Sequence, residues 1–228
     1  MQVKHVVAML GLLFLVGCSS VDVREVEPAH GPKLSVLGYA LGSFDMVPAD
    51  SPEELIEQND PEVIVVGAVE EIEQGRDYSP PEGSTRVQPY LVLRVRVSET
   101  LRAGDPGDIH DGRVNVEIPQ GSYDADGNPS VSLEQWRDAI PEGTRTLLFL
   151  HNTTHAEEND YPTENEGRGL PMGANLTSPD AQGMIFEYNN EMLSPLAEEG
   201  GEDPLSQWSV SSIDELSARV AKYLQTQN

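Results

Sequence analysis

Apolar residues recur along the chain with the spacing of β-strands. Residues 87–98 alternate apolar and polar side chains, as a half-buried strand does. Residues 63–69 are apolar on both faces, and Gly67 within them indicates a bend or a close approach of another backbone. In all, the pattern predicts five strands, at residues 63–69, 87–98, 114–118, 144–150 and 184–188.

Three helices are predicted from their start signals. Ser51-Pro52-Glu53-Glu54 is a capping box with proline at the first helical position, and this helix is expected to end near Asp60. A second capping box opens at Ser132 and predicts a helix up to Ile140. A third helix begins after Ser212, and its apolar stripe at helical spacing comprises Ile213, Leu216, Val220 and Leu224.

The order of these elements predicts a fold class. Strand, strand, strand, helix, strand, strand is the connectivity of an OB-fold barrel. We therefore expect a mainly β protein with a five-stranded OB-like barrel, a short helix between strands 3 and 4, and flanking helices. Residues 34–228 are expected to form this single domain, with the last helix docked on the barrel.

Three segments resemble the tissue-inhibitor and netrin-like OB modules of exported proteins. They are residues 61–69, 93–101 and 141–150, and the resemblance extends over about residues 61–190. It implies an OB barrel. The animal inhibitors chelate a protease zinc through a free N-terminal cysteine amine that disulfides hold in place. That activity does not carry over, because the only cysteine here, Cys18, is expected to carry lipid and no disulfide is possible.

The first 17 residues have the pattern of an export signal. Lys4 and His5 precede the apolar run Val6–Val16, which spans roughly 16 Å as a helix and is too short to cross a bilayer. Leu15-Val16-Gly17-Cys18 resembles the bacterial lipobox. This resemblance implies diacylglycerol on the Cys18 sulfur and cleavage after Gly17; the alternative is an ordinary secretory signal in which the cysteine is incidental.

The lipobox also predicts where the protein resides. The mature chain is expected to be held at the cell membrane or outer membrane through its lipid, on the extracytoplasmic side. Residues 18–33 are charged and contain Pro28, Gly31 and Pro32 without a sustained period, so they are interpreted as a flexible tether.

The charge excludes several classes of partner. Of 228 residues, 39 are acidic and 14 basic, which gives a formal charge of −25. Nucleic acid binding requires clustered Lys and Arg, so it is not expected.

One cysteine excludes a disulfide framework and a cysteine-based zinc cluster, and no P-loop or nucleophile elbow is present in the sequence. The charge itself fits a salty habitat, or a cationic or calcium-bearing partner.

Two sets of residues are candidate metal ligands. His151 and His155 have the i, i+4 spacing of a helical metal pair, but the residues between them are poor helix formers, and on a strand the rings would lie roughly 13 Å apart. Asp124–Asn128 resembles part of a calcium loop without its downstream glutamate. The acids at Asp105, Asp108 and Asp111 are read in the same way. We expect solvated loops and turns at these positions, and no cofactor.

Function is predicted only in outline. We expect a non-enzymatic, lipid-anchored protein that binds an envelope protein or glycan through the loops around residues 102–112 and 151–182. One alternative is a metal-dependent enzyme or calcium-binding envelope protein that uses the acidic loops with His151 and His155. Another is a purely structural envelope lipoprotein. Trp136 and Trp208 are candidates for stacking on a sugar, although Trp136 is expected in the core.

Overall fold

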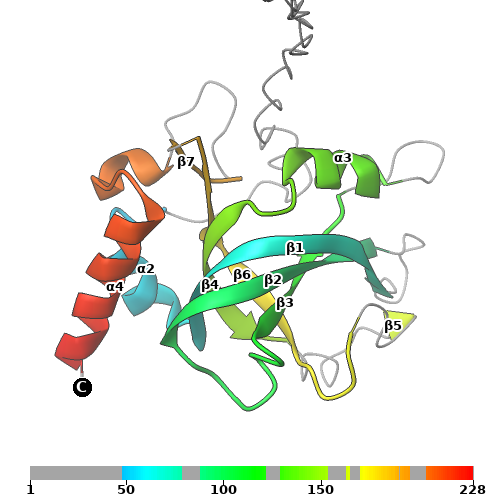
Figure 1. The fold of residues 1–228 in the computed structure, drawn as a ribbon, viewed down its shortest axis with the longest axis horizontal. Coiled ribbons are helices and arrows are strands. Elements are labelled where there is room, and N and C mark those ends of the chain that lie inside the picture. The colour runs from blue at the N-terminus through cyan, green and yellow to red at the C-terminus, as the bar shows by residue number, and fades with distance from the viewer. Residues whose placement is uncertain are drawn as a thin grey trace, which may run out of the picture. The chain divides into compact units, whose positions relative to one another are not determined.

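One sheet organises the fold, as a computed structural model of the chain shows (Figure 1). The structure describes residues 48–78, 88–121, 129–153, 163–164, 170–189, 191–195 and 204–227. The predicted signal peptide at 1–17 and the predicted tether at 18–33 lie outside these residues. The described strands are β1 Val63–Tyr78, β2 Gln88–Arg102, β3 Arg113–Pro119, β4 Arg145–Asn152, β5 Thr163–Glu164, β6 Leu176–Tyr188 and β7 Glu191–Leu193.

The five longest strands close into a ring. β1 pairs antiparallel with β2, β2 with β3, and β4 with both β6 and β1, while β3 and β6 pair in parallel. The order around the ring is therefore β1-β2-β3-β6-β4 and back to β1. β5 and β7 are short additions that pair with β1 and β6. The prediction of a mainly β chain with five principal strands is confirmed.

The helices begin at the positions that their capping residues predicted. α2 spans Pro52–Asn59, and the Ser51 hydroxyl accepts a hydrogen bond from the Glu54 amide at 3.1 Å. α3 spans Leu133–Ala139 between β3 and β4, with Ser132 and Gln135 forming a complete capping box. α4 spans Ile213–Gln227, after a 3-10 turn, η2, at Pro204–Trp208. The three predicted helices are confirmed.

Two apolar clusters hold the ring and the helices together. One fills the ring and includes Val95, Val116 and, from α3, Trp136. The other lies on the outer face of β1, β4 and β6, where α2, η2 and the apolar stripe of α4 cover the sheet. Figure 1 shows α2 and α4 together on one side of the ring and α3 apart from them. The docking role predicted for the α4 stripe is confirmed.

Two strands are longer than the apolar pattern predicted. β1 continues through residues 70–78, which are mostly polar, because this part of the strand pairs with β2 while its outward side chains remain polar. β6 begins at Leu176 rather than at Met184. Its buried Thr177 donates a hydrogen bond to the Asn115 carbonyl at 3.2 Å, which satisfies a polar side chain inside the sheet.

Candidate functional site

The outer face of β1, β2 and β3 carries a polar groove. Val95 and Val116 belong to the core inside the ring, so their neighbours along the strands, Arg94 and Asn115, lie on the opposite face. Arg94 and Asn115 are register partners between β2 and β3, which places them side by side. No helix from the second apolar cluster contributes to this part of the sheet.

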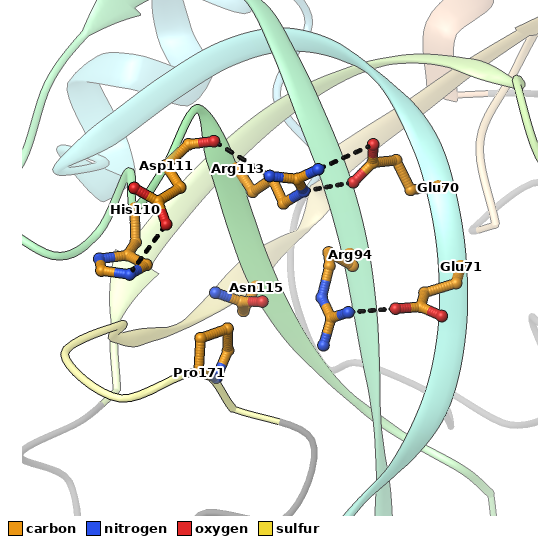
Figure 2. Close-up of a pocket in the computed structure, with 8 residues that line it drawn as sticks. All are labelled: Glu70, Glu71, Arg94, His110, Asp111, Arg113, Asn115 and Pro171. Carbon is orange, nitrogen blue, oxygen red and sulfur yellow. Dashed lines mark hydrogen bonds and ion pairs between the residues drawn. The ribbon is translucent and has the colours of Figure 1, made fainter.

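Three strands and two loops line this groove, which has a volume of about 350 Å³ (Figure 2). We refer to it as the β1–β3 groove. This volume is at the lower end of the range of about 300–1,000 Å³ for small-molecule sites. Its lining residues are Glu70, Glu71, Arg94, His110, Asp111, Arg113, Asn115 and Pro171.

A β-bulge places two consecutive glutamates at the groove. Val69 pairs with Val95 and Glu71 with Arg94, so Glu70 is one extra residue in β1 against β2. Successive side chains of a regular strand point to opposite faces, and a bulge interrupts this alternation locally. Both Glu70 and Glu71 therefore reach the outward side, where each pairs with an arginine.

Ion pairs occupy the guanidinium groups of the groove. The Arg113 Nε lies 2.5 Å from Glu70 Oε2, and Arg96 pairs with the same carboxylate. The hydrogen bond from Arg113 lowers the pKa of Glu70 below 4.5, although desolvation opposes it. Arg94 pairs with Glu71 and, at 3.0 Å, with Glu73. The carboxylate of Glu70 is thus held in its charged form by its arginine partners.

Asn115 forms the floor of the groove and carries an unsatisfied acceptor. Its side chain is 1% exposed, and its Oδ1 accepts no hydrogen bond within the part of the chain that the structure describes. A buried polar atom without a partner costs about 1–3 kcal/mol. Such atoms are uncommon in native proteins and require a specific explanation.

A buried aspartate holds the loop that carries His110 and Asp111. Asp108 is fully buried, and its Oδ1 accepts hydrogen bonds from Asn152 Nδ2 at 2.6 Å and Asn175 Nδ2 at 2.8 Å. Its Oδ2 accepts a further bond from the Asp105 amide at 2.7 Å. These three hydrogen bonds occupy both carboxylate oxygens, so Asp108 is a structural residue and not an open calcium ligand.

The opposite rim is a turn that presents an exposed methionine. The Ala174 amide donates to the Pro171 carbonyl at 3.1 Å, and Gly173 adopts φ +84°, a conformation that favours glycine. Met172 at the tip of this turn is 96% exposed. Among the described residues it is the one large apolar side chain that stands in solvent.

A second polar cluster lies further along the same strands. Arg76 and Glu117 are each 3% exposed and form a bidentate ion pair, with Nε to Oε1 at 2.7 Å and Nη2 to Oε2 at 2.9 Å. The Tyr78 hydroxyl donates to Glu117 at 2.9 Å. Burial is the main cause that raises the pKa of Tyr78 well above its usual range, and the charge of Glu117 is the second. Because its members satisfy one another, this cluster links strands and leaves no open site.

His151 lies at the end of β4, next to acidic residues. Its Nε2 is 3.0 Å from Asp180 Oδ1, and its Nδ1 is 3.9 Å from Glu62. Burial raises the pKa of Asp180, although the His151 ring opposes this shift. Within the described ranges no group of three His, Cys, Asp or Glu residues could hold a metal ion. His155, the other half of the predicted pair, lies outside the described residues.

The remaining sequence candidates divide into buried residues and undescribed ones. Trp136 and Trp208 are both fully buried, so neither can stack on a sugar. The prediction that Trp136 lies in the core is confirmed. The prediction of Trp208 as a sugar-stacking candidate was wrong. Trp208 covers the outer sheet face and donates to the Ala49 carbonyl at 3.0 Å. Cys18 and the Asp124–Asn128 segment lie outside the described residues.

The comparisons with known proteins add no relative. No protein-family model, curated protein or solved structure matches the chain. Among the helices of the described residues, none has the length and apolar character needed to cross a membrane.

Proposed function

We propose that this chain is a lipid-anchored, extracytoplasmic binding protein without enzymatic activity, and that the β1–β3 groove is its ligand surface. Its partner in this proposal is another component of the cell envelope, a protein or a glycan. Lipid on Cys18 would hold the domain at the cell membrane or outer membrane, with residues 18–33 as the tether.

The ring supports an OB-like interpretation of the domain. The strand order β1-β2-β3-β6-β4, with α3 between β3 and β4 in the chain, is compatible with the five-stranded Greek-key arrangement of OB folds. OB folds bind ligands on the face of strands 2 and 3. The β1–β3 groove lies on the corresponding strands of this chain.

The observation that carries the proposal is the contrast between the two outer faces of the ring. The face of β1, β4 and β6 is apolar and covered by α2, η2 and α4. The face of β2 and β3 instead holds charged side chains around an unsatisfied buried amide oxygen. A polar concavity with convergent side chains is the default position for a ligand.

Site-specific photo-crosslinking in cells tests this proposal. A photoreactive amino acid is introduced at Met172, which is 96% exposed on the groove rim, and in a control at the exposed Gln225 on α4. We expect a crosslinked envelope component at Met172 that the Gln225 variant does not capture. Identical products, or none, at both positions would contradict the groove as a binding surface.

A further inference from the structure

Each arginine that lines the β1–β3 groove faces a glutamate. The Arg113 Nε donates to Glu70 Oε2 at 2.5 Å. Arg94 forms an ion pair with Glu71 on the neighbouring strand (Figure 2). A cation in the groove would have to compete with these guanidinium groups, and an anion with these carboxylates. Separating such a pair leaves a partly buried charge without its counter-charge, which costs free energy. A ligand without net charge avoids this cost.

The charges of the groove are nearly balanced, in contrast to those of the whole chain. Three carboxylates and two guanidinium groups line the groove, while the chain carries a formal charge of −25. The carboxylate in excess is that of Asp111, whose side chain is 82% exposed. An ion pair with a carboxylate this exposed contributes little, because water screens it. Asp111 therefore does not by itself make the groove a site for a cation.

The buried atoms beneath the groove surface favour neither sign of charge. Asn115 Oδ1 and Arg94 Nε are both buried, so a ligand contacts the exposed ends of the side chains around them. One of these atoms is an acceptor and the other belongs to a cationic donor group, on register partners of β3 and β2. The choice of ligand is therefore made by the exposed polar atoms of the lining.

A hydroxyl group matches the mixture of donors and acceptors around the groove. It donates one hydrogen bond and accepts two, whereas an ammonium only donates and a carboxylate only accepts. The side chains of Glu71 and Arg113 are 43% and 33% exposed, so each presents polar atoms beside its ion pair. A hydroxyl can donate to such a carboxylate and accept from a guanidinium without separating the pairs. Among the described residues of the lining Pro171 is the one apolar residue, so the ligand is polar over most of its surface.

We propose that the β1–β3 groove binds a neutral sugar residue of an envelope glycan, whose hydroxyl groups donate to Asp111 and Glu71 and accept from Arg113. This inference rests on the proposed function, because it names the chemistry of the ligand that the same groove takes. A sugar ring carries hydroxyl groups on adjacent carbons, so it contacts carboxylates and a guanidinium at once. No Trp, Tyr or Phe is among the described residues that line the groove, so a single ring is expected to bind weakly, with a Kd of about 1 mM.

Three forms of one sugar test the preference for a neutral ligand. Methyl glucoside, its 6-amino-6-deoxy analogue and methyl glucuronoside share a pyranose ring and are neutral, cationic and anionic at neutral pH. Methyl galactoside and methyl mannoside repeat the neutral arm with other hydroxyl orientations. Saturation-transfer NMR measures binding to the full chain, kept in a detergent without a sugar headgroup. We expect saturable binding of at least one neutral sugar and about tenfold weaker binding of its charged forms. The neutral sugar's affinity should change less than about twofold with added salt.

Two variants locate the binding, and one controls for charge. Asp111→Asn removes a charged acceptor at φ +48°, a conformation that asparagine tolerates, and Glu71→Gln removes another. Each is expected to lower the affinity for the neutral sugar about tenfold, since hydrogen bonds to charged groups are the strong ones. Glu99→Gln removes the same charge from an exposed position of β2 outside the groove. It is expected to leave the affinity within about twofold. Urea unfolding of each variant checks that it folds.

Three sets of results would overturn the sugar assignment. The first is binding of either charged form as tight as that of the neutral sugars, or no saturable binding of any neutral sugar. The second is an affinity that Asp111→Asn and Glu99→Gln lower equally. The third is tighter binding of Nα-acetyl-lysine amide or Nα-acetyl-glutamate amide, which would assign the groove to a protein side chain. The photo-crosslinking experiment is independent of ligand chemistry. A captured partner at Met172 together with a failed sugar titration would therefore retain the groove as a binding surface and reject only the sugar.

Discussion

Glu70 shows how one extra residue creates a charged site on a sheet. Its carboxylate pairs with Arg113 from β3 and Arg96 from β2, although Glu70 itself comes from β1. The bulge makes this possible, because in a regular strand Glu70 and Glu71 would point to opposite faces. Loss of Glu70 would leave two arginines near each other without their shared partner.

The stability contributed by Glu70 depends on pH in a defined direction. Its pKa is lowered in the folded state, first by the hydrogen bond from Arg113, from an ordinary value of 4.5. The contribution is therefore present above 4.5 and is lost as pH falls through the lowered pKa. We expect Glu70→Gln to be less stable than the wild type at about pH 7, and the difference to shrink toward about pH 3.

Urea unfolding at both pH values measures this difference, with Glu99→Gln as the matched control. The control removes one carboxylate from an exposed position of β2, and we expect it to change stability little at either pH. A stability gap for Glu70→Gln that widens on acidification would contradict the assigned ion pairs.

Single residues were predictable where backbone geometry demands them. Gly67 was expected to mark a bend or a close approach, and a Cβ at this position would clash with the Arg96 carbonyl oxygen. The predicted N-cap residues Ser51 and Ser132 accept the expected amide bonds. Asn115 gave no such signal, because its burial depends on residues brought together from β2, the turn before β3 and the segment before β6.

Elements were predictable where one face of a strand packs into the core. The five principal strands follow either apolar alternation or a continuous apolar run, and the ring that they form uses each of the five predicted segments. Residues 70–78 were missed as a strand because charges that pair across strands look, in the sequence, like those of a solvated loop. The groove was missed because its ion-paired residues Glu70 and Arg113 lie 43 residues apart in the sequence.

The Arg76–Glu117 pair joins β1 to β3 across β2, and its removal tests this connection. Glu117→Gln leaves the Arg76 charge buried without its counter-charge, so we expect a loss of about 3–5 kcal/mol in the free energy of unfolding. Replacing both partners, Arg76→Met with Glu117→Leu, removes both charges and should recover most of that loss. Urea unfolding at neutral pH provides the measurement. A loss below about 1 kcal/mol in Glu117→Gln would show that the pair does not stabilise the sheet.

For the whole molecule, the arrangement of the ring is compatible with the predicted lipid anchor. A domain held by lipid needs one face free for its partner. The helices α2 and α4 cover one outer face of the ring, and the β1–β3 groove lies on another. The chain's strong negative charge repels anionic lipid headgroups, so the proposed attachment depends on acyl chains and not on surface electrostatics.

The N-terminus of the protein isolated from cell membranes provides the most direct test of this account. Mass spectrometry of the N-terminal peptide should show a chain that begins at Cys18 and carries diacylglycerol on its sulfur. A Cys18→Ala variant should lose both the lipid and the membrane association. An unmodified Cys18, or a mature chain that begins at another residue and remains soluble, would contradict the claim that this is a lipid-anchored binding protein.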